Sequence, residues 1–247
     1  MKNRRKFIGG LCGIGLTSMS GCIDRIRNFG STDDESVEYP EGLSENSISI
    51  SALSENNGIL NGDVDSYKYN YELKMDDEIE EKRIENVEFN DYTVIHEKEY
   101  EGDNIISETY KNESENIRFV NESGELIGFQ GLPPMSRKGV LNYNRFRSNI
   151  SDLEFEKPEI TTIDDVEGNI FIYETSDSPE IFENLYNEIE ELDIIVKIHE
   201  TGYIIYLEIN LLADGIRRTV KHEYSDFNDI TIDRPEWVDD VDEIISR

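Results

Sequence analysis

Residues that commonly build catalytic or metal centres are scarce in this chain. Among its 247 residues there are two cysteines, three histidines and one tryptophan. Both cysteines, Cys12 and Cys22, stand near the N-terminus, which excludes a disulfide framework across the rest of the chain. No histidine pair has the spacing of a zinc protease, and the body holds neither a phosphate loop nor a nucleophile elbow. We therefore expect no catalytic residues, no metal site and no cofactor.

Long apolar runs are also missing. The N-terminal apolar stretch, from Phe7 to Leu16, is too short to cross a bilayer, which takes about 20 residues. Basic residues precede this stretch, and small residues follow it as far as Gly21. That order is typical of an export signal and does not predict a transmembrane helix.

Two details specify the kind of signal. Arg4 and Arg5, followed by Lys6-Phe7-Ile8, resemble the twin-arginine motif, which exports folded proteins. Met19-Ser20-Gly21-Cys22 resembles a lipobox, whose cysteine receives two acyl chains, enough for a stable membrane anchor. We expect residues 1–21 to be removed and lipidated Cys22 to hold the protein on the extracellular face of the membrane. The alternatives are an ordinary basic signal and a cysteine placed there by chance.

Acidic residues dominate the rest of the chain. The sequence has 55 acidic and 24 basic residues, and four of the basic ones precede Cys22, which leaves a formal charge of −35 on the expected mature chain. Such self-repulsion opposes folding unless salt screens it. The acids are spread along the chain, and 13 Tyr and 10 Phe provide material for a core. We expect a folded, halophilic protein that does not bind nucleic acid.

The apolar pattern after Cys22 predicts a tether and one body. Residues 22–40 have no apolar period and read as a flexible acidic tether, and residues 41–247 read as a single β-rich domain. The clearest strand is 66–75, where apolar and polar residues alternate. Expected helices span 45–60, 138–148 and 178–191. Residues 128–150 interrupt the strand pattern, with a turn or loop at 131–134. The other expected strands are 80–89, 92–100, 104–111, 115–121, 168–175, 193–199, 203–213 and 215–224, and their spacing favours an antiparallel meander.

Two stretches resemble lipid-carrying lipoproteins. They are Tyr39-Pro40-Glu41-Gly42-Leu43 with the helix and strand that follow it, and His222-Glu223-Tyr224-Ser225-Asp226-Phe227 leading through Ile230-Thr231-Ile232 to Pro235. With the signal and the tether, they resemble a haloarchaeal lipoprotein and, more distantly, the half-barrel carriers of the bacterial LolA and mycobacterial lipid-binding types. The resemblance implies an α+β fold in which one curved antiparallel sheet packs on helices. It also implies a hollow for an acyl chain.

Two sets of candidate site residues follow. If the resemblance holds, the residues on the inward faces of the strands line the hollow. The ordinary alternative is that the same residues fill a core. These residues are Tyr67, Tyr69, Tyr71, Ile205, Leu207, Ile209, Val220 and Tyr224. Three triplets fit the acceptor pattern for Asn-linked glycans, although such triplets also arise by chance; they begin at Asn112, Asn121 and Asn149.

Function is less well specified than location. The expected function is a non-enzymatic, lipid-anchored surface protein that binds an apolar, lipid-like ligand or a protein partner. The alternative is a structural or interaction module of the cell envelope without a ligand. Acidic clusters such as Asp76-Asp77-Glu78 lack the ligand spacing of a calcium loop and are expected to be a solvated surface.

Overall fold

A computed structural model describes most of the chain after residue 37. The described residues are 38–131, 133–141, 143, 146, 150, 153–163 and 166–245. Arg4, Arg5, Cys22 and Asn149 lie outside them, as does most of the tether. The chain divides into the units Met1–Ser31 and Thr32–Arg247, and all described residues belong to the second.

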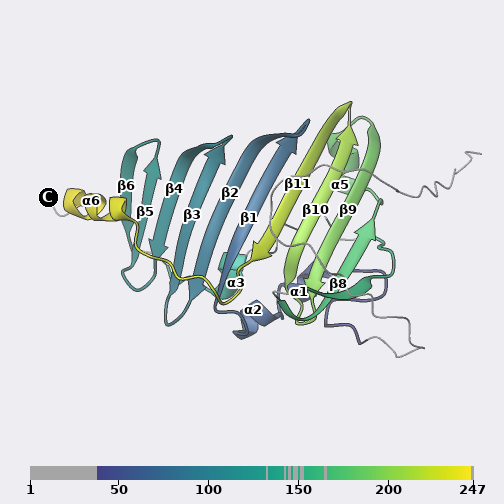
Figure 1. The fold of residues 1–247 in the computed structure, drawn as a ribbon, viewed down its shortest axis with the longest axis horizontal. Coiled ribbons are helices and arrows are strands. Elements are labelled where there is room, and N and C mark those ends of the chain that lie inside the picture. The colour runs from purple at the N-terminus through teal and green to yellow at the C-terminus, as the bar shows by residue number, and fades with distance from the viewer. Residues whose placement is uncertain are drawn as a thin grey trace, which may run out of the picture. The chain divides into compact units, whose positions relative to one another are not determined.

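The described part is built around one open antiparallel sheet of 11 strands (Figure 1). Its strands are β1 Ser66–Met75, β2 Glu78–Phe89, β3 Thr93–Glu101, β4 Asn104–Asn112, β5 Ile117–Glu122, β6 Glu125–Gln130, β7 Glu159–Ile163, β8 Val166–Thr175, β9 Ile189–His199, β10 Ile204–Ala213 and β11 Ile216–Ser225. Its helices are α1 Ile50–Leu53, α2 Gly58–Asn61, α3 Arg137–Leu141, α5 Glu180–Leu185 and α6 Glu236–Ile245.

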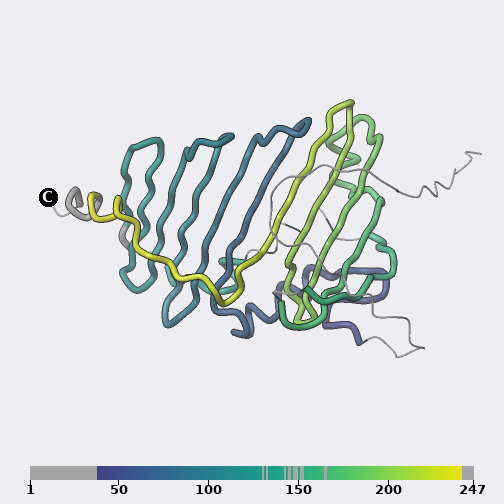
Figure 2. Tube along the Cα trace, viewed as in Figure 1, coloured from purple at the N-terminus to yellow at the C-terminus, as the bar shows by residue number. Residues whose placement is uncertain are grey.

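The sheet consists of two meanders joined in the middle. The strand order is β6-β5-β4-β3-β2-β1-β11-β10-β9-β8-β7, so β1 to β6 form one meander and β7 to β11 the other. Strand β1 pairs with β11, with Tyr69 opposite Tyr224 and Tyr71 opposite His222. Figure 2 shows these two strands side by side at the centre of the sheet. Strands β6 and β7 are the two edges, so the sheet does not close.

One side of the sheet, here called the core face, carries most of the buried apolar residues. Residues directly opposite each other on paired strands share a face. Tyr69 is opposite Tyr224, and Leu207 is opposite His222, which lies two residues from Tyr224 on the same face of β11. Tyr69, Tyr224 and Leu207 pack in one cluster with α1, α2 and residues such as Phe146. The most completely buried members of this cluster include Tyr67, Leu53, Ile59, Leu141, Phe146, Ile150, Tyr173, Ile194 and Leu207.

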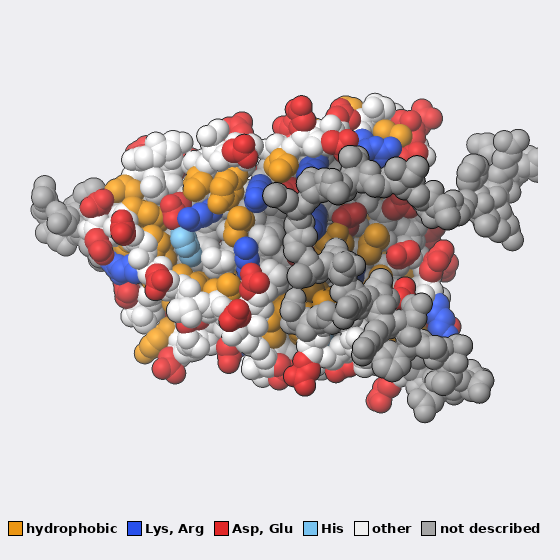
Figure 3. Space-filling model, in the orientation of Figure 1, with side chains coloured by type: hydrophobic (Ala, Val, Ile, Leu, Met, Phe, Trp, Pro, Cys, Tyr) orange, Lys and Arg blue, Asp and Glu red, His pale blue; other side chains and the backbone are white. Residues whose placement is uncertain are grey.

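The other side, here called the outer face, is covered at one end by the C-terminal segment. After β11 the chain runs back across the ends of β1 to β6 to reach α6 beside β6 (Figure 1). Val238 is fully buried there in a small cluster with Tyr110, Ile117 and Phe119. Figure 3 shows this face, where acidic side chains are scattered between apolar ones and do not form a single block.

Most expected strands are confirmed, including 66–75 with the predicted bounds. The prediction of a single helix at 45–60 was wrong, because α1 ends at the cap Ser54 and a second short helix, α2, begins after the cap Asn57. The helix at 178–191 ends at Leu185, and its last residues belong to β9.

Three further differences concern the edges and the C-terminus. Strands β6 and β7 were not predicted, and β6 extends into the start of the stretch 128–150, where the strand pattern was expected to break. Residues 230–235, part of the second stretch that resembles the carriers and in which a closing strand was expected, form no strand, and α6 follows immediately. The segment 230–235 makes few ladder bonds because it crosses the strands instead of running beside one of them.

Candidate functional site

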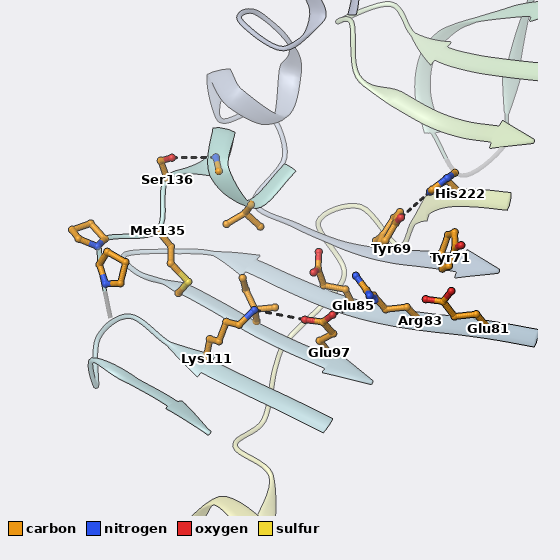
Figure 4. Close-up of a pocket in the computed structure, with 15 residues that line it drawn as sticks. Tyr69, Tyr71, Glu81, Arg83, Glu85, Glu97, Lys111, Met135, Ser136 and His222 are labelled. Carbon is orange, nitrogen blue, oxygen red and sulfur yellow. Dashed lines mark hydrogen bonds and ion pairs between the residues drawn. The ribbon is translucent and has the colours of Figure 1, made fainter. Parts of the chain in front are cut away.

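A cleft of about 670 Å³ opens on the core face beside the apolar cluster. Its floor is formed by β1 to β4 with His222 of β11, and its wall by the segment that leads into α3 (Figure 4). This volume falls in the range of about 300–1,000 Å³ that is usual for small-molecule sites. The lining residues are Tyr69, Tyr71, Glu81, Arg83, Glu85, Ile95, Glu97, Lys111, Pro133, Pro134, Met135, Ser136, Gly139, Val140 and His222.

Arg137 fixes the wall of the cleft to the rest of the fold. Its guanidinium donates to the carbonyl oxygens of Ile59 at 3.0 Å and Phe89 at 3.3 Å, and to that of Val64. It also pairs with Asp65 at 3.0 Å and lies 4.5 Å from the ring centre of Phe89. One side chain thus connects α3 to α2, to the entry of β1 and to the end of β2.

Glu113 holds the beginning of the wall. One of its carboxylate oxygens accepts from the backbone N–H of Met135 at 3.3 Å and the other from that of Thr93 at 3.0 Å. The Thr93 hydroxyl in turn donates to the carbonyl of Met135 at 3.3 Å. The thioether of Met135 therefore projects into the cleft from a backbone that is fixed on both sides (Figure 4).

A tyrosine–histidine pair closes the end of the cleft nearest the apolar core. The Tyr69 hydroxyl lies 2.8 Å from Nδ1 of His222, and both residues are buried. The His222 ring also meets the Phe146 ring edge-on, with 5.0 Å between centres, and contacts Tyr71 at 5.1 Å. These contacts fix the ring of His222 between two tyrosines and a phenylalanine. This arrangement provides a polar group at the boundary of an apolar wall.

Charged side chains from adjacent strands form the rest of the floor. The Glu97 carboxylate forms ion pairs with both basic residues of the floor, at 3.3 Å from Arg83 Nε and 3.6 Å from Lys111 Nζ. Arg83 also bonds Glu99 at 2.8 Å. Burial is the main cause that raises the pKa of Tyr71, and the nearby charge of Glu81 raises it further. The Tyr71 phenol therefore stays neutral and serves the cleft as an aromatic face and a hydrogen-bonding hydroxyl.

The residues predicted to line a hollow divide into three groups. Tyr69 and Tyr71 line the cleft. Ile205 stands at a bulge where the pairing of β10 with β9 skips it, and with Tyr224 it lines a second hollow of about 610 Å³. The remaining four pack into or against the core cluster; they are Tyr67, Leu207, Ile209 and Val220.

Sequence reasoning did not identify the charged floor. Glu85, Arg83 and Glu81 alternate along β2, so their shared face was readable from the sequence. The residues that these side chains contact on neighbouring strands were not readable from the sequence. The contact of Arg83 with Glu97, for example, depends on the pairing register of β2 with β3. The wall residue Met135 lies in the stretch 128–150, where the sequence has no strand pattern that would place it beside the sheet.

The two described glycosylation candidates differ in accessibility. Asn112 is 8% exposed, and its amide nitrogen donates to the Tyr110 hydroxyl and to Glu115, each at 3.1 Å. Asn121 is half-buried at the end of β5, and its oxygen accepts from the N–H of Gly124 at 3.1 Å. The structure thus presents Asn121 next to an exposed hairpin turn and encloses Asn112.

Within the described residues, no group of three or more His, Cys, Asp or Glu side chains is arranged to hold a metal ion. Among the same residues, no helix is long and apolar enough to cross a membrane. No protein-family model matches the chain, and no curated protein matches its sequence.

Proposed function

We propose that this chain is an exported, lipid-anchored surface protein that binds a small amphiphilic ligand in the cleft between β1–β4 and the wall segment. The observation that carries the proposal is the two-sided lining of the cleft. Ile95, Met135 and Val140 supply apolar contacts, and Arg83 and Glu97 supply charges within the same 670 Å³. A ligand with a short apolar part and a polar head satisfies both sides at once.

The resemblance to half-barrel lipoprotein carriers supports part of this proposal. A curved half-barrel presents one open face to a ligand, and an open antiparallel sheet of 11 strands is compatible with that form. In the carriers the ligand lies between sheet and helices. In this chain Phe146, Leu141 and Leu207 occupy the corresponding space as fully buried core residues. We therefore assign the ligand to the cleft beside the core and not to the space beneath the helices.

The anchoring part of the proposal has a direct test. Protein isolated from the membrane fraction should yield an N-terminal peptide that begins at Cys22 and carries the mass of two lipid chains. A Cys22→Ser variant should lose stable membrane association, because lipid insertion contributes roughly 0.8 kcal/mol per buried methylene. Native protein that retains residues 1–21 and stays in the cytoplasm would overturn this part.

The binding part is tested by occlusion. A Met135→Trp variant places a larger side chain in the cleft, and it should abolish binding of short amphiphiles while the unfolding transition stays cooperative. Retained binding in this variant would mean that the ligand sits elsewhere.

The packing of the predicted lining residues favours a second candidate function. Tyr67, Leu207 and Ile209 are each at most 2% exposed and belong to the core, as expected for a solid structural module of the cell envelope. Protein that binds no amphiphile yet crosslinks to one envelope protein would favour this module over the binding protein.

A further inference from the structure

The second hollow, of about 610 Å³, lies where β10 begins and where β9 and β11 end. Its volume is within the range of about 300–1,000 Å³ that is usual for small-molecule sites. Ile205, Tyr206 and Phe227 give it apolar and aromatic walls, and Lys197 is the one basic residue among the described residues that line it. The described lining of this hollow shares no residue with that of the cleft, so the two are separate sites.

Lys197 stands among apolar and aromatic neighbours. Its directly opposite residues are Ile172 of β8 and Tyr206 of β10, and its ammonium nitrogen lies 4.9 Å from the centre of the Tyr206 ring. Lys197 is half-buried. No carboxylate in the described part of the chain forms an ion pair with it, although acidic residues outnumber basic ones by 55 to 24. Lys197 therefore carries a positive charge to which the described residues supply no counter-charge.

The two acidic residues beside Tyr206 already have partners of their own. Glu223, directly opposite Tyr206 on β11, pairs with Lys221 Nζ at 3.1 Å. Glu208, two residues along β10, accepts a hydrogen bond from the Tyr206 hydroxyl. Neither carboxylate can turn to Lys197 without breaking an existing contact.

Two further acids line the hollow but are exposed to solvent. They are Asp226, which pairs with Lys68 at 3.9 Å, and Asp229. Water and salt screen exposed charges of this kind, with a Debye length of about 3 Å at 1 M. A half-buried ammonium is screened less, and it keeps part of its desolvation cost when no anion is nearby. An anion held against Lys197 would offset that cost, and the exposed acids would oppose it only weakly.

We propose that the second hollow binds a small organic carboxylate with a short alkyl chain. The carboxylate forms a charge-assisted hydrogen bond with the Lys197 ammonium, which the Tyr206 ring holds in place, and the chain packs against Ile205 and Phe227. This site is independent of the ligand proposed for the cleft, and it adds a second ligand of defined charge.

Isothermal titration of the full-length protein with hexanoate and with hexanol tests the proposal. The two probes have equal chain lengths and differ in charge. Titration in about 1 M KCl screens the field of the acidic surface, because the Debye length is then about 3 Å. Hexanoate should bind at least about tenfold more tightly than hexanol, because a hydrogen bond between charged groups contributes more than one to a neutral hydroxyl.

Four variants locate the binding. Lys197→Met keeps the length of the side chain without its charge and should weaken hexanoate binding about tenfold, whereas Lys197→Arg should keep it. Ser225→Phe narrows the hollow from β11 while retaining Lys197, and it should abolish binding.

Lys82→Met is the matched control and should leave binding unchanged. The Lys82 ammonium also lies over a tyrosine ring, 5.5 Å from the centre of Tyr100, and it forms no ion pair with a described residue. Lys82 lines neither the cleft nor the second hollow. Circular dichroism confirms that each variant is folded, and Lys197→Met and Ser225→Phe test the site independently if one of them is not.

The outcomes separate this site from the cleft. Equal losses in Lys197→Met and Lys82→Met would reveal general attraction to basic residues and overturn the proposal. Hexanoate that survives Lys197→Met and is lost with Met135→Trp binds in the cleft, which also overturns it. Absence of hexanoate binding overturns it as well, whereas hexanol binding that is lost only with Met135→Trp would still support the ligand proposed for the cleft.

Discussion

Replacing Arg137 with alanine should destabilise the protein by about 3–5 kcal/mol. The guanidinium serves three backbone carbonyls, at Ile59, Val64 and Phe89, and stacks on the Phe89 ring. Hydrogen bonds from a charged group contribute about 1.5–3 kcal/mol each, and an exposed cation–π contact contributes about 0.5–1 kcal/mol.

The sum of those contributions overstates the loss. The Arg137 side chain is 24% exposed, so water reaches part of the vacated site, and an arginine loses about 2 kcal/mol of rotamer entropy when it is fixed. The bridge to Asp65, whose side chain is 64% exposed, adds about 0–1 kcal/mol at most. The low end of the sum, about 5 kcal/mol, less the rotamer entropy leaves about 3 kcal/mol, and water that solvates the vacated carbonyls brings the high end down to about 5 kcal/mol. A loss of about 3–5 kcal/mol is a large part of the about 5–15 kcal/mol typical of a domain.

Urea denaturation followed by circular dichroism, at high salt, measures the free energy of unfolding. Arg137→Lys keeps the charge but not the fork of donors, and it should lose roughly half as much as the alanine variant. Lys138→Ala is the matched control, because Lys138 and its partner Glu55 are 54% and 71% exposed and such pairs contribute about 0–1 kcal/mol. An Arg137→Ala variant within about 1 kcal/mol of the wild type would refute the reasoning.

Three further predictions concern salt, pH and modification. Circular dichroism should show loss of structure as salt falls below about 0.5–1 M, because acidic repulsion is then unscreened; a fold unchanged at about 50 mM would contradict this. Burial alone would raise the pKa of Glu108, but the hydrogen bond with His96 at 2.6 Å and the charge of Lys98 at 3.6 Å help to outweigh it, and the pKa is lowered. The contribution of Glu108 to stability is therefore present above its unfolded pKa and is lost as the pH falls through the lower folded pKa, and Glu108→Gln should flatten the acid limb of a stability–pH curve. Peptide mapping of protein from its native membrane should find any glycan on Asn121 and none on the enclosed Asn112, and a glycan at Asn112 would show that modification precedes folding.

The regular part of the sheet was predictable because its signals are local. Alternation from Tyr67 to Met75, and turns such as Asp214-Gly215, specify strands and hairpins without knowledge of the rest of the chain. The adjacent segments β9, β10 and β11 were expected as a hairpin ladder, and they form one.

The cleft was not predictable because its parts meet only through long-range pairing. Glu97 and Arg83 come together through one register of β2 on β3, and Met135 reaches them through contacts of Glu113 and Arg137. The helix α6 was missed because its apolar side has no local partner and packs on distant strands. Tyr67 and Leu207 alternate equally well as core or as cavity lining, and only the packing of Phe146 against this face distinguishes the two.

The central pairing of β1 with β11 has a consequence for biogenesis. Tyr69 and His222, which bond across this junction, are 153 positions apart in the sequence. During synthesis the edge of β1 that pairs with β11 therefore stays unpaired until almost the whole polypeptide has left the ribosome. Such non-local pairing is also slow to form. A twin-arginine translocase accepts folded cargo. If the chain takes that expected route, it crosses the membrane only after the last strand is complete, and a chain shortened before Ile216 keeps β1 as an unpaired, aggregation-prone edge.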